Sequence, residues 1–448
     1  MRSFSSVLCL AGLMVLGGQA FAEIGAIDSV PAATLLLPYF EVGLEDSGSH
    51  VTTLFSINNA SAAPAVVHVT LWTKLARPTL DFDMYLTGYD VVTVNLRDLF
   101  TTGAIPQTGP NFDPGDDTIT PNAPGEFSDP DAAPPGCSFP LPTNLPASLL
   151  TYIRRLHTGL DAPPGFDNSG LCGALDEGHA DPADGIATGY ITFDVVNDCS
   201  LLFPGNPGYF SDGGTGIAAN TNILWGDYFL ADPANAFAQG DQLVHIEALD
   251  SVQNGFWSPG DYTFYGRYLT YDASDNREPL ATTWASRYFA GTAGPFNDDS
   301  DIICWRDSGL DDSFFFACGN NFPAPYPLVQ NQIVVFDEQE NPVVVEGPQF
   351  SPPEIPDVIA PCACASNRAN ANEFGTIFDF GWFYMNLNTS TGAIPDPIKQ
   401  SFVTTVHSAS GLFSVGFQAV HLDSALDKTF TVTTAPADVN LPVEDEEP

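Results

Sequence analysis

Short runs of alternating apolar and polar residues recur along this chain of 448 residues and constrain its fold more than any other feature. Such alternation places successive side chains on opposite faces, which is typical of a β-strand with one buried face. The runs are rich in Val, Ile, Thr, Phe and Tyr, the residues that favour strands. In the first quarter of the chain they lie at residues 34–40, 51–57, 66–72, 80–86 and 89–96.

Five short strands separated by turn residues resemble an immunoglobulin-type β-sandwich over roughly residues 30–100. This resemblance is one of architecture alone and implies no functional residues. Later runs predict strands at residues 189–196, 222–230, 243–249, 262–271, 301–306, 332–336, 378–387, 402–407 and 412–422. The sequence therefore predicts an all-β protein of two immunoglobulin-like or related β-sandwich units, with long Pro/Gly/Asp-rich loops and one or two short helices.

The predicted organisation follows from the places where the alternating runs stop. We expect a signal peptide at 1–22, an N-terminal β-sandwich unit at 23–101, a Pro/Gly/Asp-rich loop with a short helix at 102–165, a larger β-sandwich unit at 166–435 and an acidic tail at 436–448. Residues 147–156 have helical spacing before Gly159. Residues 280–289 fit a second helix, with Pro279 at its first turn and Gly291 just past its end.

The N-terminus has the three parts of a secretory signal peptide. Arg2 precedes an apolar run over residues 7–16, and Ala20 and Ala22 form a small-residue cleavage site before Glu23. The apolar run is too short to span a bilayer, and no later segment reaches the roughly 18 apolar residues of a spanning helix. We therefore expect a secreted, periplasmic or cell-surface protein without a membrane span.

Export would place the cysteines in an oxidising compartment, where disulfides form. Loss of Cys9 with the signal peptide takes one of eight cysteines and leaves an odd number, so one is available for a disulfide to another chain. The expected pairs are Cys172 with Cys199 and Cys304 with Cys318, because each closes a modest loop between predicted strands. A zinc site is the alternative, but the C-x2-C spacings and nearby His ligands that it needs do not occur.

The charge balance excludes some partners. The chain has 13 Lys and Arg against 55 Asp and Glu, a formal net charge of -42. Nucleic acids and anionic membranes are bound through clustered basic residues, and the sequence has no such cluster. We therefore expect no nucleic-acid partner, and an extracellular or surface protein or a carbohydrate as the ligand.

Aspartates gather in turn-like segments, where two interpretations compete. Calcium prefers several oxygen ligands and often ties loops together in exported domains. The candidate calcium ligands are Asp176, Asp181, Asp184, Asp298, Asp299 and Asp301. Asp also favours turns on its own account, because its side chain bonds nearby backbone amides. Calcium is the one cofactor that the sequence suggests.

No catalytic motif is present: the sequence contains neither G-x-S-x-G nor H-E-x-x-H. His68, His245, His407 and His421 all lie inside predicted strands, where hydrogen-bonded sheet positions are commoner than catalytic bases. An aromatic-rich ribbon at residues 256–268 fits either a sugar-binding platform or core filling between sheets.

Two functions remain open from the sequence. The first is a structural or adhesive protein of the cell surface or extracellular space that works by binding. The second is a secreted hydrolase acting on polysaccharide or another polymer, with structural calcium. A deep cleft with convergent catalytic groups would favour the enzyme, whereas flat faces and filled cores would favour the binding protein.

Overall fold

The structure is a computed structural model, and most of the strand-forming regions of the chain are described. The described residues are 30–44, 51–74, 78–105, 144–158, 160, 163, 185–233, 237–248, 263–265, 275–290, 300–308, 332–345, 366–370, 378–387, 399–409 and 413–421. The predicted signal peptide, most of the Pro-rich segment and the acidic tail lie outside these residues.

Strands dominate the described part of the chain, which has two short α-helices and one 3-10 turn besides. The strands of the first half are β1 (Thr34–Gly43), β2 (Thr52–Asn59), β3 (Ala65–Trp72), β4 (Pro78–Leu86), β5 (Val91–Asn95), β6 (Ile186–Val196), β7 (Leu224–Asp232), β8 (Phe237–Gln242) and β9 (Val244–Ile246). Those of the second half are β10 (Thr283–Phe289), β11 (Ser300–Ser308), β12 (Gln332–Phe336), β13 (Pro342–Val345), β14 (Ser366–Asn370), β15 (Phe380–Asn386), β16 (Lys399–Ala409), β17 (Phe413–Gln418) and β18 (Val420–His421).

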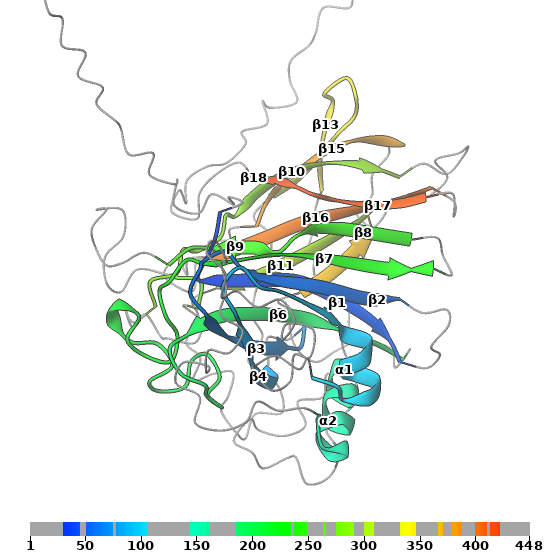
Figure 1. The fold of residues 1–448 in the computed structure, drawn as a ribbon. Coiled ribbons are helices and arrows are strands. Elements are labelled where there is room, and N and C mark those ends of the chain that lie inside the picture. Colours follow the sequence, from blue (N-terminus) through cyan, green and yellow to red (C-terminus); the bar gives the residue numbers. More distant parts are fainter. Residues whose placement is uncertain are drawn as a thin grey trace, which may run out of the picture.

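The strands form four antiparallel sheets (Figure 1). The first two have the orders β4-β3-β6-β1-β9 and β5-β2-β7-β8, and the last two have the orders β13-β12-β15-β10-β18 and β14-β11-β16-β17. The predicted all-β class is therefore confirmed, while the division into two immunoglobulin-like units stays a prediction.

The first two sheets join strands that lie far apart in the sequence. In the sheet β4-β3-β6-β1-β9, which we call the five-stranded sheet from here on, Thr34 of β1 pairs with Asp194 of β6. In the four-stranded sheet, Phe55 of β2 pairs with Tyr228 of β7. Both sheets thus combine strands from the predicted N-terminal unit at 23–101 with strands from the predicted larger unit at 166–435.

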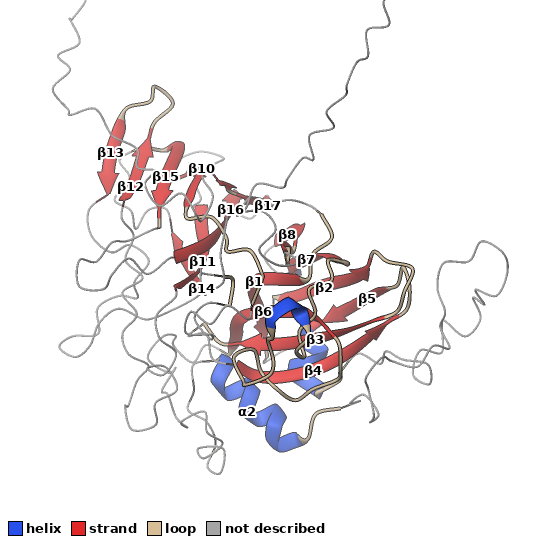
Figure 2. Ribbon diagram, turned by 90° about the vertical axis from the view of Figure 1, so that its left-hand side faces the viewer, coloured by secondary structure: helices blue, strands red, loops and turns tan. Residues whose placement is uncertain are grey.

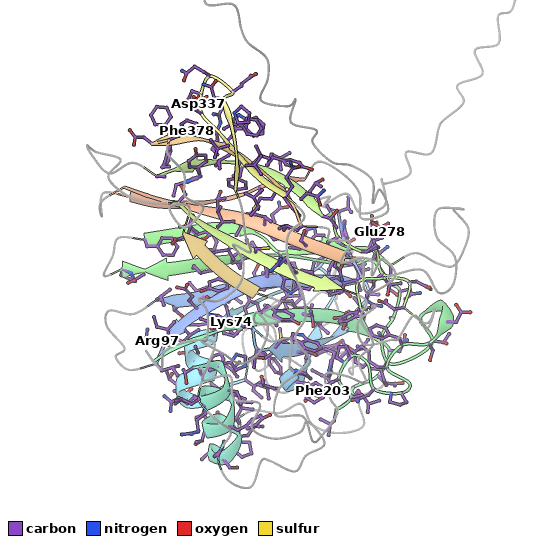
Figure 3. The ribbon with its side chains drawn as sticks, turned by 180° about the vertical axis from the view of Figure 1, so that it is seen from behind. Lys74, Arg97, Phe203, Glu278, Asp337 and Phe378 are labelled. Carbon is purple, nitrogen blue, oxygen red and sulfur yellow. The ribbon has the colours of Figure 1, made fainter. Side chains whose placement is uncertain are left out.

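Two apolar clusters fill the space between the sheets (Figure 3). The first cluster combines side chains of the first two sheets, such as Leu35 and Phe193 from one and Phe55 and Tyr228 from the other. The second cluster combines the opposite face of the five-stranded sheet, including Trp72, with residues of both later sheets. The five-stranded sheet is therefore buried on both faces, which explains why β1 and β3 read as nearly continuous apolar runs.

Two helices contribute side chains to the first cluster, and Figure 2 shows α2 beside the sheet that contains β4. Helix α2 (Ala147–His157) confirms the helix predicted at 147–156. Helix α1 (Leu96–Thr102) was not predicted, although Asn95 caps its start and Gly103 ends it at φ 74°. These are ordinary helix boundary signals, but the strand pattern predicted for residues 89–96 overlaps the start of the helix.

The helix predicted at 280–289 is wrong, because this segment contains strand β10. Trp284 and Tyr288 are buried in the second cluster, and β10 pairs along its whole length with β15. Pro279 and Gly291 resembled helix boundaries, but the extended pairing with β15 and the burial of the two rings outweigh that local signal.

No described helix is long and apolar enough to cross a membrane.

Candidate functional site

A row of polar side chains crosses the middle of the five-stranded sheet. The strand registers pair Asp83 with His68, His68 with Asp194, and Asp194 with Thr34. All four side chains are buried. Because residues at one register share a face, the row faces the second apolar cluster, and its charges need partners there.

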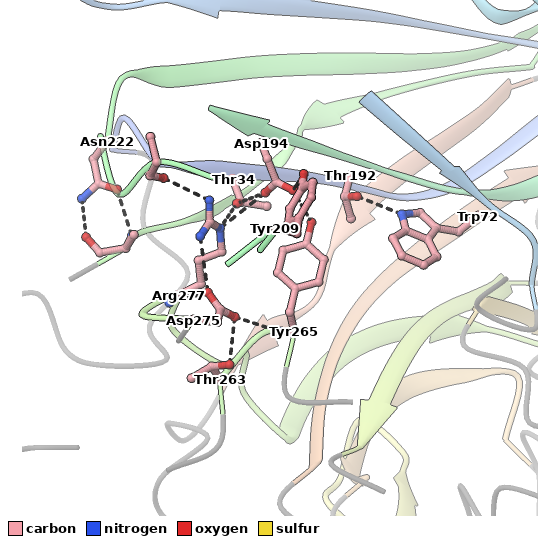
Figure 4. A network of polar contacts seen from close by, with 12 residues as sticks. Thr34, Trp72, Thr192, Asp194, Tyr209, Asn222, Thr263, Tyr265, Asp275 and Arg277 are labelled. Carbon is pink, nitrogen blue, oxygen red and sulfur yellow. Dashed lines mark hydrogen bonds and ion pairs between the residues drawn. The ribbon is translucent and has the colours of Figure 1, made fainter. Parts of the chain in front are cut away.

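Arg277 supplies the central partner of this row (Figure 4). Its Nε lies 3.4 Å from Asp194 Oδ1 and donates to the Thr34 hydroxyl. Its Nη1 lies 3.3 Å from Asp275 Oδ1, and its Nη2 donates to the Ala219 carbonyl at 3.1 Å. The guanidinium is fully buried, and it contacts Thr34, Asp194, Asp275 and the Ala219 carbonyl.

Two tyrosines complete the hydrogen bonding of Asp194. The hydroxyls of Tyr209 and Tyr265 both donate to Asp194 Oδ2, at 2.7 and 2.9 Å. Burial and the nearby carboxylate raise the pKa of both phenols well above their usual value, so they stay protonated as donors. The Arg277 guanidinium also lies over the Phe210 ring, 5.2 Å from its centroid, which adds a cation–π contact.

Asp275 is the second carboxylate beside Arg277. It accepts from the Thr263 hydroxyl at 2.8 Å and from the backbone amide of Tyr265 at 3.0 Å. Burial raises the pKa of Asp275, while Arg277 and these donors oppose the rise. For Arg277, burial alone would lower the pKa, but Asp194 and Asp275 outweigh it, so its pKa is raised and the group stays charged.

His68 forms the other end of the row. Its Nδ1 lies 2.8 Å from Asp83 Oδ1, and its Nε2 lies 3.9 Å from Asp81 Oδ2. Burial alone would lower the pKa of His68, but Asp83, Asp81 and Asp194 outweigh it and the pKa is raised. Burial raises the pKa of Asp81 as well. His68 therefore holds its proton more strongly than usual because of the surrounding carboxylates, and Asp81 does so because it is buried.

This buried cluster is closed to ligands. The side chains of Arg277, Asp194 and Asp275 are at most 1% exposed, and they satisfy one another through the bonds given above. Buried charges that are paired in this way hold structure together, because removing one partner leaves another charge without compensation. The cluster therefore positions strands and loops and does not by itself offer a binding site.

A serine–histidine pair occurs in the sheet that contains β11 and β16. Ser300 Oγ lies 2.7 Å from His407 Nδ1 and accepts from the amide of Phe289 at 2.7 Å. Burial lowers the pKa of His407 to about 4, so the imidazole is neutral near pH 7. Although this resembles an activated nucleophile, Ser300 is 0% exposed, so a substrate cannot reach its hydroxyl in this state.

The four-stranded sheet β5-β2-β7-β8 presents a different kind of surface. Four large apolar side chains on it are exposed: Leu54 (38%), Val91 (57%), Trp225 (43%) and Phe229 (49%). Register brings Leu54 opposite Phe229, while Asp227 lies between Trp225 and Phe229 on the same side of β7. We call Leu54, Val91, Trp225, Asp227 and Phe229 the outer face.

Alternation along the strands explains why these residues point outward. Their neighbours Phe55, Ile57, Tyr228 and Leu230 point the other way and are buried in the first apolar cluster. Because the side chains of the inner face already fill the core, the apolar residues of the outer face are not buried in it. Grouped apolar side chains of this kind often mark an interaction surface.

The predicted calcium ligands are only partly covered by the structure. Asp301 lies on β11, whereas Asp176, Asp181, Asp184, Asp298 and Asp299 lie outside the described residues. Within the described residues, no group of three His, Cys, Asp or Glu side chains could hold a metal ion. Calcium binding by these clusters stays a prediction.

The predicted disulfides have a mixed outcome. Cys199 is disulfide-bonded, and neither Cys172 nor any other partner for it lies among the described residues. Cys304 is a free and buried thiol, which does not support the expected bond to Cys318, itself outside the described residues. Cys304 sits in the middle of β11 with its side chain in the second cluster, and burial raises its pKa to about 12.

Three residues of the predicted aromatic ribbon are described, and they favour the core interpretation. Phe264 and Tyr265 are buried in the second cluster, and the hydroxyl of Thr263 donates to Asp275. Trp225 and Phe229 on β7 are instead exposed, and they share a sheet face with Asp227.

Comparison with protein-family models, with curated proteins and with solved structures finds no match for this chain.

A further buried histidine links helix α2 to the five-stranded sheet. His157 Nδ1 donates to the carbonyl of Thr188 at 2.8 Å, and its Nε2 accepts from the Thr79 hydroxyl at 2.7 Å. The ring also packs near Phe40 and Phe100. Burial lowers the pKa of His157 to about 4, because no carboxylate among the described residues offsets the desolvation of the charged form.

Asp194→Asn tests the importance of the buried cluster. An amide cannot balance the Arg277 charge, and its NH2 group cannot accept from both tyrosine hydroxyls. We expect a loss of about 3–5 kcal/mol in the free energy of unfolding, measured by denaturant titration. Asp212→Asn, at an exposed aspartate, is the control and should change stability by less than about 0.5 kcal/mol. Equal effects of the two substitutions would contradict a structural role for the cluster.

His157 makes a prediction about pH. Because its pKa is lowered from 6.5 to about 4 in the fold, the unfolded chain takes up the proton first, and stability falls as the pH drops through this window. Replacing His157 with Gln should remove about 3 kcal/mol of that fall, as measured by urea unfolding at pH 7 and pH 4. His68→Gln is the control: the pKa of His68 is raised, so its loss should steepen the fall. An unchanged pH dependence in His157→Gln would refute the assignment.

Proposed function

We propose that the protein is exported and acts as a structural or adhesive binding protein at the cell surface or in the extracellular space, built on immunoglobulin-like β-sandwich units. The observation that carries this proposal is the outer face, where exposed Trp225, Phe229, Leu54 and Val91 share one side of a sheet whose other side already fills the core. Surplus apolar side chains gathered on a sheet face are typical of recognition surfaces.

Export is supported by the order of charge, apolar run and cleavage site in residues 1–22. The high acidity fits a soluble partner-binding role, since a net charge of -42 keeps copies of the chain apart. Disulfide bonding of Cys199 fits an oxidising compartment.

A secreted hydrolase is the second candidate, and Ser300 with His407 is the observation that would favour it. The serine hydroxyl is fully buried, and its hydrogen bonds to His407 and to the Phe289 amide join strands of two sheets. These features favour a structural role for the pair and leave binding as the better supported function.

The proposal predicts a processed protein that binds without degrading its target. Mass spectrometry should find Glu23 as the mature N-terminus in the fraction outside the cytoplasm of the producing cells. Purified protein incubated with polysaccharide and protein polymers should release no soluble fragments. An intact precursor in the cytosol, or fragment release that is abolished in Ser300→Ala, would overturn the proposal in favour of an intracellular protein or a hydrolase.

A further inference from the structure

The two rings of the outer face are spaced along one strand. Trp225 and Phe229 are four residues apart on β7 and lie on the same side, which places their Cα atoms roughly 13 Å apart at the usual rise of a strand. Phe229 lies against Gly240 of β8, where an added Cβ would come within 2.4 Å of the ring. The glycine therefore leaves room for the ring to rest on the neighbouring strand.

Polar groups lie between and beside these rings. Asp227 accepts from the Ser56 hydroxyl at 2.6 Å through Oδ1. The amide nitrogen of Asn58 donates to the carbonyl of Trp225 at 3.2 Å, but Asn58 Oδ1 is buried without a hydrogen-bond partner among the described residues.

A strained residue stands at the end of the sheet where Trp225 lies. Tyr89 has a φ of 58° and is 52% exposed. It precedes Val91 in the turn before β5, and Val91 and Trp225 are both paired with Asn58. A left-handed conformation is unfavourable for a bulky residue, and such strain is concentrated at functional sites. Tyr89 thus lies in the turn at the end of the sheet where Val91 and Trp225 are paired with Asn58.

The charge of this sheet restricts what it can bind. Strands β2, β5, β7 and β8 contain no Lys, Arg or His, and they carry Asp227, Asp232 and Asp241. Polyanions would therefore meet repulsion without a compensating base. A second copy of the chain would bring a further formal charge of -42. Stable protein interfaces also need about 20–30 residues a side, far more than this patch offers.

We infer that the outer face binds an uncharged polysaccharide chain, laid along β7 with sugar rings against Trp225 and Phe229 and with a hydroxyl bonded to the partly exposed Asp227 between them. This inference rests on the proposed binding function and names its ligand class. Aromatic side chains offer rigid apolar faces at small entropic cost, and the Asp227 carboxylate can accept a hydrogen bond from a sugar hydroxyl.

A depletion binding assay with the mature chain tests this inference. The probes are an insoluble neutral glucan, chitin, a polygalacturonate gel and beads coated with polylysine. Trp225→Ala and Phe229→Ala are the test variants, and Phe380→Ala, which removes an exposed ring from strand β15, is the matched control. All three side chains are about half exposed, so the melting temperature should stay close to that of the wild type and exclude unfolding as a cause.

We expect retention on the neutral glucan or chitin, a loss of roughly tenfold in affinity for each test variant, no change for Phe380→Ala, and no retention on polygalacturonate. Retention on polylysine beads alone would overturn the inference in favour of a cationic partner, while the binding function would stand. Binding to neutral polysaccharide that is unaffected by either test variant would also overturn it. Failure of the proposed function itself would appear separately, as cytosolic precursor or as fragment release.

Discussion

The buried ion pair between Arg277 and Asp194 is the contact on which the rest of the arrangement depends. Asp194 lies in the middle of the five-stranded sheet, and Arg277 comes from a segment that leads into the later sheets. A fully buried charge is unstable without its partner, so the two regions must assemble together. The tyrosine hydroxyls and the Asp275 carboxylate then fix the position of the guanidinium.

The same sheet separates two apolar clusters, and this explains which groups are buried in the interior. One face of the sheet packs against β2 and β7, and the other receives the polar row and the second cluster. Both interiors are filled, so titratable groups such as His407 and Asp194 serve structure. The exposed aromatic residues Trp225 and Phe229 lie on the outer surface of the sheet β5-β2-β7-β8, to which we assign the proposed recognition. The β12–β13 turn with Asp337 lies at the opposite end of the molecule from α2 (Figure 3).

Local sequence patterns predicted the elements that depend on interactions between residues close together in the chain. Alternation identified most strands, and helical spacing identified α2, because both signals lie within a few residues. The segment at 280–289 was misassigned because Pro279 and Gly291 resemble helix ends, while pairing with β15 is a long-range effect. The cluster of Arg277 and Asp194 was missed because its members are separated by 83 positions (277 − 194). Single charged residues inside apolar runs, such as His68 and Asp194, were the available signal. The outer face was missed because pairing of β2 with β7 creates it.

Native-state amide hydrogen exchange on the intact protein tests most directly whether this buried ion pair joins the two regions into one cooperative unit. The account predicts that β1, β3 and β6 exchange in the same slow class as residues 275–280, and that Asp194→Asn accelerates exchange in both regions together. If residues 275–280 open independently while β1, β3 and β6 stay protected, the ion pair does not couple the regions and the central claim fails.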